Sequence, residues 1–230
     1  MLVEGYDEIQ LALSAGHQPQ TLLTSPELVT RQMESIPAET VTVNRTVFEK
    51  MSYRENPDGW LAVFPIPHTS LDDLQLSELP LIIIAEAVEK PGNLGAILRT
   101  ADAAGVDALL VCDPRVDLWN PNVVRASRGA LFTVPTVEID NVSALVWLKT
   151  LKIRILAATP SAATMYANVN LREPIAFALG TEAEGLTDFW ISNADLKIRI
   201  PMQGKVNSLN VSVSTALIVY EALRQRSQPR

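Results

Sequence analysis

The chain has 230 residues, of which 47% are hydrophobic and 20% are charged. This composition is typical of a globular protein that buries its own core, and no apolar run approaches the roughly 18 residues that a membrane helix needs. The net charge of −7 argues against a general nucleic-acid binder, because such proteins are usually basic. The first residues, MLVEGYDEIQ, carry acids where a signal peptide has a basic and an apolar segment, so we expect a cytoplasmic location.

The single cysteine, Cys112, lies in the apolar run DALLVCD. We expect a buried thiol there rather than a nucleophile. One cysteine and two distant histidines, His17 and His68, cannot complete the four-ligand shell of a structural zinc site. We therefore expect no metal.

The first third of the chain is predicted to form a small α/β domain, residues 1–70. EGYDEIQLALSAG is helix-like and ends on a glycine suited to a C-terminal cap. The segments QTLLTS, TVTV and GWLAVFPIP have strand composition, and a helix is predicted between the last two. Residues 1–77 carry 11 acidic and 4 basic side chains, whereas residues 78–230 carry 15 of each, so the whole net charge belongs to this first part.

A larger α/β domain, residues 80–230, is predicted after a linker at 71–79, where prolines and acids show little periodicity. Its apolar runs are long enough to be parallel strands buried on both faces, with helices on either side. These runs are LIIIAEAV, DALLVCD, FTVPTVEI, IRILAAT, IAFALG and LKIRIPM. Ligands of such sheets bind beyond the carboxyl ends of the strands, so the loops after these runs are where we look for a site.

The segment EKPGNLGAILRTADAAGVDALLV, residues 89–111, is the first candidate. Asn93 is expected to cap a helix that Gly105 ends. Gly95 and Arg99 are four residues apart and share a helix face. Either Gly95 leaves open surface in front of the Arg99 guanidinium, or Gly95 allows close packing while Arg99 pairs with Asp102. The segment lacks the Gly-x-Gly-x-x-Gly pattern of a dinucleotide loop.

Two later segments follow strands of the same predicted sheet. GTEAEGLTDFW, residues 180–190, offers two glycines for backbone turns and the acids Glu182 and Glu184. A paired-carboxylate hydrolase is possible here, but sugar-site aromatics are missing. In IRIPMQGKVNSLNVSVSTALIVYEAL, residues 198–223, Ser208 is expected to cap a helix whose first turns hold small polar residues. Such residues suggest either close helix packing or contacts to a ligand.

Taken together, the three segments resemble the three motifs of the SpoU or TrmH family of RNA ribose 2′-O-methyltransferases, in the SPOUT class. NLGAILRTADAAG is similar to the first motif, LGTEAEGL to the second and IPMQGKVNSLNVSVSTALIVYEAL to the third. NPNVVRASRGALFTVP, residues 120–135, resembles the segment between motifs. The resemblance spans roughly residues 78–225. It implies a C-terminal trefoil knot, S-adenosylmethionine as cofactor, RNA (rRNA or tRNA) as substrate and a homodimer through the knot region.

The resemblance also implies a set of site residues. Arg99 would act on the ribose hydroxyl, but a guanidinium with a pKa above about 12 is a poor base, so it could instead orient the acceptor phosphate and stabilise a developing alkoxide. The remaining catalytic positions would be Asn93, Glu182, Ser208 and Asn210. Cofactor-binding positions would be Leu179, Gly180, Ile200, Met202 and Leu209. RNA-binding positions would be Arg115, Arg125, Arg128 and Lys205.

The first third resembles the small substrate-recognition domain of many family members, with two departures. It is acidic, and its usual leading strand is expected to be absent, so that the domain would be truncated at its start. Two other functions remain open. One is a catalytically inactive, knotted RNA-binding or assembly module, which the acidic first third favours. The other is a nucleotide-dependent oxidoreductase, which the missing glycine fingerprint disfavours.

Overall fold

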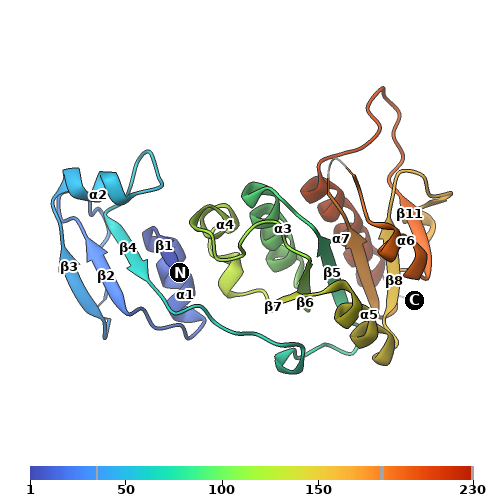
Figure 1. Ribbon diagram of the computed structural model, residues 1–230, viewed down its shortest axis with the longest axis horizontal. Coiled ribbons are helices and arrows are strands. Elements are labelled where there is room, and N and C mark those ends of the chain that lie inside the picture. Colours follow the sequence, from blue (N-terminus) through green and yellow to red (C-terminus); the bar gives the residue numbers. More distant parts are fainter. Residues whose placement is uncertain (35, 182–183, 229–230) are drawn as a thin grey trace.

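The computed structural model describes residues 1–34, 36–181 and 184–228. Over these residues the chain forms a small sheet, ordered β1-β4-β2-β3, and a large sheet, ordered β7-β6-β5-β10-β8-β11-β9. The two sheets lie at opposite ends of an elongated molecule, and the segment between β4 and β5 runs along one side from one to the other (Figure 1). None of the described helices is both long and apolar enough to cross a membrane.

The small domain is the part that carries the small sheet. Its elements are β1 (Leu2–Glu4), α1 (Tyr6–Ser14), β2 (Thr21–Thr24), β3 (Glu39–Thr42), α2 (Arg45–Met51) and β4 (Trp60–Val63). The expected absence of a leading strand is wrong. β1 pairs antiparallel with β4, and the Met1 ammonium donates a hydrogen bond to the Phe64 carbonyl (2.6 Å). Three residues are too few to show a strand period, and Gly5, with φ of 110°, turns the chain directly into α1.

The large domain is built on parallel strands, as the continuous apolar runs predict. Every ladder pair among its described strands is parallel. The strands are β5 (Leu81–Glu86), β6 (Ala108–Cys112), β7 (Thr136–Ile139), β8 (Arg154–Ala158), β9 (Thr164–Met165), β10 (Ile175–Leu179) and β11 (Leu196–Arg199). β10 lies between β5 and β8, so the carboxyl ends of strands distant in the sequence meet at one edge.

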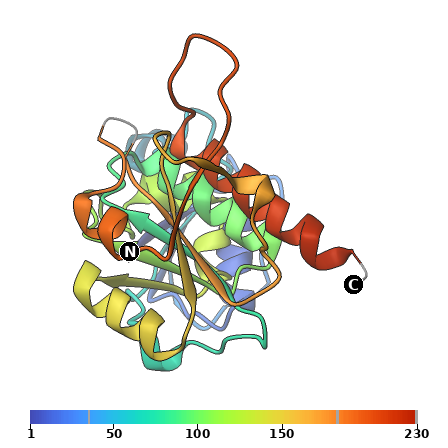
Figure 2. The same cartoon turned by 90° about the vertical axis from the view of Figure 1, so that its right-hand side faces the viewer.

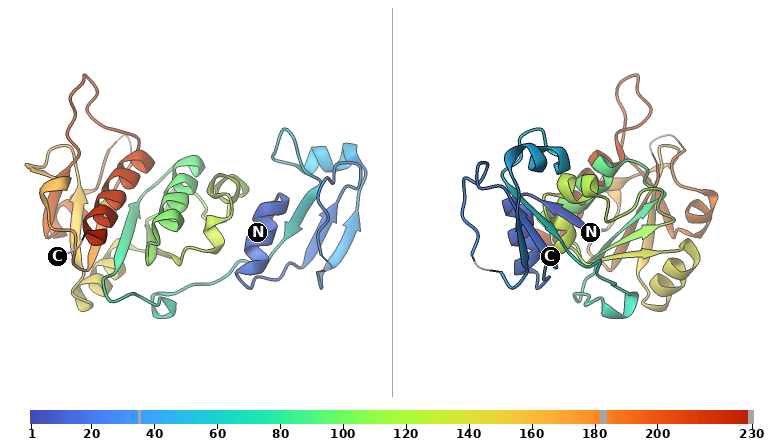
Figure 3. Two further views of the ribbon diagram at one scale, coloured as in Figure 1. Left: turned by 180° about the vertical axis from the view of Figure 1, so that it is seen from behind. Right: turned by 60° about the vertical axis from the view of Figure 1, so that its left-hand side comes forward.

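Helices cover both faces of the large sheet, which confirms the predicted α/β class. They are α3 (Pro91–Ala104), α4 (Pro121–Ser127), α5 (Asn141–Thr150), α6 (Asp188–Asn193) and α7 (Val211–Ser227), with short 3₁₀ turns η1 (Leu71–Asp73), η2 (Ala130–Phe132) and η3 (Tyr166–Asn168). Side chains of β5 alternate between two cores: Ile83 packs with α3, α4 and α7, whereas Ile82 and Ile84 pack with α5 and α6. Figure 3 shows α7, α3 and α4 side by side on their face.

The small domain packs on the large one through α1, β1, α4 and η2. Gly129, with φ of 87°, has no side chain, and a Cβ there would come within 2.6 Å of Leu11 on α1. The ring of His17 lies 5.5 Å from the ring of Phe132, and the Arg125 guanidinium donates to the Tyr53 carbonyl (3.1 Å). Apolar contacts and the Arg125–Tyr53 hydrogen bond therefore help to join the two domains.

The last turn of α7 is tied to the strand entrances of the large sheet. The Arg226 guanidinium donates to four backbone carbonyls, those of Leu79 (2.6 Å), Pro80 (3.2 Å), Leu171 (3.0 Å) and Glu173 (2.8 Å). Burial lowers the pKa of Arg226. Because all of these partners are neutral, the contacts hold position rather than neutralise charge.

Candidate functional site

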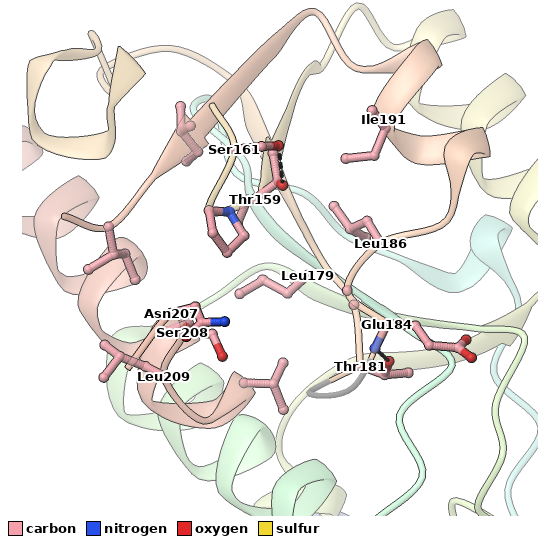
Figure 4. Close-up of a pocket in the computed structure, with 18 of the residues that line it drawn as sticks. Thr159, Ser161, Leu179, Thr181, Glu184, Leu186, Ile191, Asn207, Ser208 and Leu209 are labelled. Carbon is pink, nitrogen blue, oxygen red and sulfur yellow. Dashed lines mark hydrogen bonds between the residues drawn. The ribbon is translucent and has the colours of Figure 1, made fainter. Parts of the chain in front are cut away.

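A pocket of about 620 Å³ opens at the carboxyl ends of β8, β10 and β11, and we call it the strand-end pocket. Its apolar wall comes from strand ends, and its polar groups come from the loops that follow (Figure 4). The lining residues fall into four segments: Ala158, Thr159, Pro160 and Ser161; Leu179, Gly180, Thr181, Glu184, Gly185, Leu186, Asp188 and Ile191; Ile198, Ile200 and Met202; and Asn207, Ser208, Leu209, Val211 and Ser214. All five residues predicted to bind a cofactor, and Ser208, are among them.

The loop after β10 is shaped by two glycines that approach each other. Thr181 and Gly185 exchange two backbone hydrogen bonds of 3.1 Å, and the Glu184 N–H donates to the Thr181 hydroxyl (3.0 Å). A Cβ on Gly180 would lie only 2.0 Å from the Gly185 carbonyl oxygen, and Gly185 has φ of 74°. Both positions therefore require glycine for this loop to close against the pocket. Glu182, a predicted catalytic residue, lies outside the described residues.

Asn93 and Asn210 meet, although 117 residues separate them. The Asn210 side-chain amide donates to the Asn93 side-chain oxygen (3.0 Å), and its own oxygen accepts from the Ser212 N–H (2.9 Å). Asn210 is thus the N-cap of α7, so the expected cap at Ser208 is wrong by two residues. The expected cap at Asn93 is also wrong. The helix begins earlier, at Pro91, whose fixed φ suits a first helical position, and the N-cap is Lys90.

Arg99 lies elsewhere, in a second hollow of about 540 Å³ that we call the arginine cleft. Arg99 and Arg128 are both exposed there, beside the ring of Tyr220 on α7. Leu11 of the small domain completes the lining, so the cleft lies where the two domains meet. The other lining residues are Ala96, Thr100, Asp102, Ala103, Ser127, Ala130 and Thr133. Among the described residues, none lines both hollows.

Of the two roles expected for Gly95, open surface in front of Arg99 or close helix packing, the structure shows close packing. A Cβ at Gly95 would come within 2.4 Å of the Ala126 Cβ on α4, so the glycine lets α3 and α4 lie in close contact. Gly95 does not line the arginine cleft, so the open space beside Arg99 is not formed by the missing side chain at Gly95. Within the part of the chain that the structure describes, Arg99 forms no ion pair with Asp102, whose carboxylate accepts from the Thr133 hydroxyl instead (2.5 Å).

The other predicted RNA-binding residues are exposed but do not gather in one hollow. Arg115 is exposed and lies 3.8 Å from the Glu89 carboxylate. Arg125 is exposed but its guanidinium is used in the contact with the small domain. Lys205 stands on the exposed loop between β11 and α7, which projects from the rest of the molecule (Figure 2). Of the four, only Arg128 lies in the same hollow as Arg99.

Thr159 and Ser161, which sequence reasoning did not select, also face the strand-end pocket. Their hydroxyls lie 3.1 Å apart in the loop directly after β8. Ligands of parallel sheets bind beyond the strand ends, so this rule already indicates the loop after β8. The sequence of that loop contains no recognisable motif, and for this reason the two residues were not predicted. They add polar groups to a wall that is otherwise made of proline and alanine.

Nucleophilic thiol chemistry has no support in this structure. Cys112 is fully buried in β6, as expected, and burial raises the pKa of its thiol far above the usual value. Among the residues described, no three histidine, cysteine or acidic side chains gather closely enough to hold a metal ion.

Comparison with known proteins identifies the family. Residues 80–220 match the model of the SpoU rRNA methylase family. The chain belongs to the SpoU rRNA methylase family. Residues 1–62 also match the MRM3-like substrate binding domain, which agrees with the resemblance of the first third to a recognition domain.

Relatives of this SpoU family member are similar over nearly its whole length. A 23S rRNA (uridine(2479)-2′-O)-methyltransferase of Streptomyces viridochromogenes is 30% identical over 247 residues, covering 100% of this chain and 84% of the relative. The crystal structure of an RNA 2′-O ribose methyltransferase superposes with a TM-score of 0.87 at 42% identity, covering 98% and 88% of the two chains. The SpoU methyltransferase AviRb of S. viridochromogenes in complex with AdoMet gives a TM-score of 0.91 at 27% identity, covering 100% and 91%.

Proposed function

We propose that this chain transfers a methyl group from S-adenosylmethionine to a ribose 2′-hydroxyl of a structured ribosomal or transfer RNA. The observation that carries the proposal is the strand-end pocket, where the second and third motifs converge on one cavity of about 620 Å³. That volume lies within the range of about 300–1,000 Å³ typical of cofactor sites. The family match and the AdoMet complex of AviRb support the same donor.

The residues of the pocket suit such a donor. Leu179, Ile200 and Leu209 offer an apolar surface for adenine, and the backbone at Gly180, which lines the pocket, can hydrogen-bond without any phosphate loop. The hydroxyls of Thr159, Ser161 and Ser208 are available to the polar ribose and amino-acid ends. We also propose that the chain in this region is threaded as the trefoil knot of the family, which would bend the donor compactly.

When bound, S-adenosylmethionine supplies a methyl group already activated by its sulfonium. The acceptor hydroxyl is a weak nucleophile until its proton leaves, so positioning and charge stabilisation decide the rate. We assign Arg99, with Arg128 beside it, to the acceptor phosphate and the developing alkoxide. Asn210 is assigned to positioning, because it holds Asn93 and the start of α7 together beside the pocket. Glu182 stays a prediction, either structural or catalytic.

We further propose that Arg115, Arg125 and Lys205 contact RNA phosphates outside the two hollows. They would let a domain of zero net charge present a basic side to RNA, despite the acidity of the small domain. The small domain would then recognise RNA through the face next to the arginine cleft, where Leu11 lies.

A homodimer through α7 belongs to the proposal. Val213, Leu217 and Tyr220 form an apolar stripe on this helix and are 47%, 39% and 49% exposed. Their spacing of four and three residues puts them on one face, as a helix that packs on a partner requires. Leu217→Glu should reduce the molar mass measured by light scattering from two chains to one. Val146→Glu, at a 60% exposed position of α5, is the matched control and should remain a dimer.

The direct test is incorporation of tritiated methyl from S-adenosylmethionine into RNA that lacks its modifications. Label that survives alkaline hydrolysis in a resistant dinucleotide would establish the ribose hydroxyl as acceptor. Binding of S-adenosylmethionine in calorimetry without transfer to any RNA would instead favour the inactive RNA-binding or assembly module. Absence of both would reject the proposal.

A further inference from the structure

A buried carboxylate lies behind the strand-end pocket without lining it. Glu86 is the last residue of β5 and is 1% exposed. The alternation along β5 places it on the same face as Ile82 and Ile84, toward α5 and α6. A carboxylate that is withdrawn from water needs donors for its oxygen atoms. The donors found here come from a distant part of the chain.

Among the described residues, three hydrogen-bond donors reach the Glu86 carboxylate, and two of them belong to one residue. Its Oε2 accepts from the Thr187 backbone N–H (2.8 Å), and its Oε1 accepts from the Thr187 hydroxyl (2.6 Å). The third donor is the side-chain amide of Asn141, 3.0 Å from Oε1. Glu86 and Thr187 are 101 residues apart, so no local geometry of the chain demands this contact.

Thr187 stands where the second-motif loop enters α6. It is the N-cap of that helix, yet its side chain makes no capping bond and donates to Glu86 instead. One turn later, the Trp190 indole N–H donates to the Asn141 side-chain oxygen (2.5 Å). The first turn of α6 is therefore held at two points. Thr187 bonds to Glu86, and Trp190 bonds to Asn141, which itself bonds to Glu86.

We infer that Glu86 is a positioning residue that fixes the second-motif wall of the strand-end pocket through Thr187. Glu184, Gly185 and Leu186 precede Thr187, and Asp188 and Ile191 follow it; all five line the pocket. The inference rests on the proposed function, because it concerns the affinity of that pocket for the methyl donor. Both oxygens of Glu86 are acceptors, so an amide in its place would turn a donor group toward a donor.

The experiment measures the Kd of S-adenosylmethionine by calorimetry for the full-length protein and its variants. Glu86→Gln should raise this Kd about tenfold or more, the loss expected for a hydrogen bond to a charged group. Thr187→Val should also weaken binding, whereas Thr187→Ser keeps the hydroxyl and should bind as the wild type does. In steady-state assays the KM for the donor should rise while the KM for RNA stays unchanged.

Glu4→Gln is the matched control for a merely structural effect. Glu4 is also a buried carboxylate, 6% exposed, and it accepts from the Ser52 hydroxyl and from the Tyr53 N–H (2.8 Å) within the small domain. Its loss should lower the melting temperature without changing the donor Kd.

The outcomes distinguish the positioning role of Glu86 from the proposed methyl-transfer function. A wild type that does not bind S-adenosylmethionine would overturn the proposed function and, with it, the inference. A wild type that binds, alongside Glu86→Gln and Thr187→Val variants with unchanged Kd, would overturn the inference alone. If Glu86→Gln fails to fold, the comparison of Thr187→Val with Thr187→Ser decides the question.

Discussion

The strand-end pocket and the arginine cleft differ in how they are built. The pocket belongs to one domain, and backbone geometry shapes it, since Gly180 and Gly185 close its loop. The cleft lies between two domains, and its character comes from two exposed guanidiniums. A hollow shaped by backbone tolerates few changes, whereas one lined by long, exposed cationic side chains can adapt to its ligand. Donor binding and RNA binding should therefore respond to different substitutions.

The sharpest way to separate the two hollows is Gly180→Ala. Its Cβ would collide with the Gly185 carbonyl, 2.0 Å away, and a backbone oxygen cannot move aside as a side chain can. We expect the affinity for S-adenosylmethionine in calorimetry to fall at least about 100-fold. RNA binding, measured by filter retention, should be nearly unchanged.

The control for that substitution is Gly92→Ala. Gly92 has an ordinary helical φ, and an added Cβ would meet nothing within 4 Å. Its donor affinity should match the wild type. Equal donor affinity in the Gly180→Ala variant would mean that the loop after β10 does not shape the binding site.

The next largest effect is expected for Arg99→Ala, which tests the cleft. Methyl transfer should fall by about 100-fold or more, the usual loss when a group that stabilises developing charge is removed. The donor Kd should change by less than about twofold, because Arg99 does not line the strand-end pocket. Equal losses of turnover and donor binding would instead make Arg99 a structural residue. Arg45→Ala, an exposed arginine of α2 paired with Glu49, controls for loss of charge.

Arg128→Ala should affect RNA binding more mildly. If Arg128 neutralises one phosphate, its removal weakens binding several-fold and makes the slope of log K against log salt shallower by about one. Fluorescence anisotropy at several salt concentrations measures both quantities. Arg45→Ala, on α2 of the small domain and paired with Glu49, should leave the slope as it is. An unchanged slope for Arg128→Ala would remove this residue from the RNA contact.

The smallest effect concerns pH and the contact between the two domains, where His17 packs on Phe132. Burial against Phe132 lowers the pKa of His17, so the unfolded chain binds its proton more readily than the folded one. Stability from this contact is present above the unfolded pKa of about 6.5 and is lost as pH falls below it. Wild-type melting temperature should decline more steeply between pH 7 and pH 5 than that of His17→Phe. Parallel profiles would contradict this role for His17.

Local pattern predicted most of the elements, and contact between distant residues explains the failures. The runs LIIIAEAV and IAFALG each contain a buried strand, because a fully apolar run has few alternatives. β1 and β9 have three and two residues, too few for any period, and exist because β4 and β11 offer partners. The rule that ligands bind beyond the carboxyl ends of parallel strands correctly predicted where a pocket lies. Nothing local could show that Thr187 bonds Glu86 across 101 residues.

The four carbonyl contacts of Arg226 change how the large domain can come apart. Helix ends usually fray first, because their last carbonyls lack partners and open at little cost. Here the last turn of α7 is fastened to the backbone just before β5 and just before β10, so opening it also loosens the entrances of two central strands. Slow amide exchange should therefore extend to the end of α7. The end of α7 should then open only together with the entrances of β5 and β10.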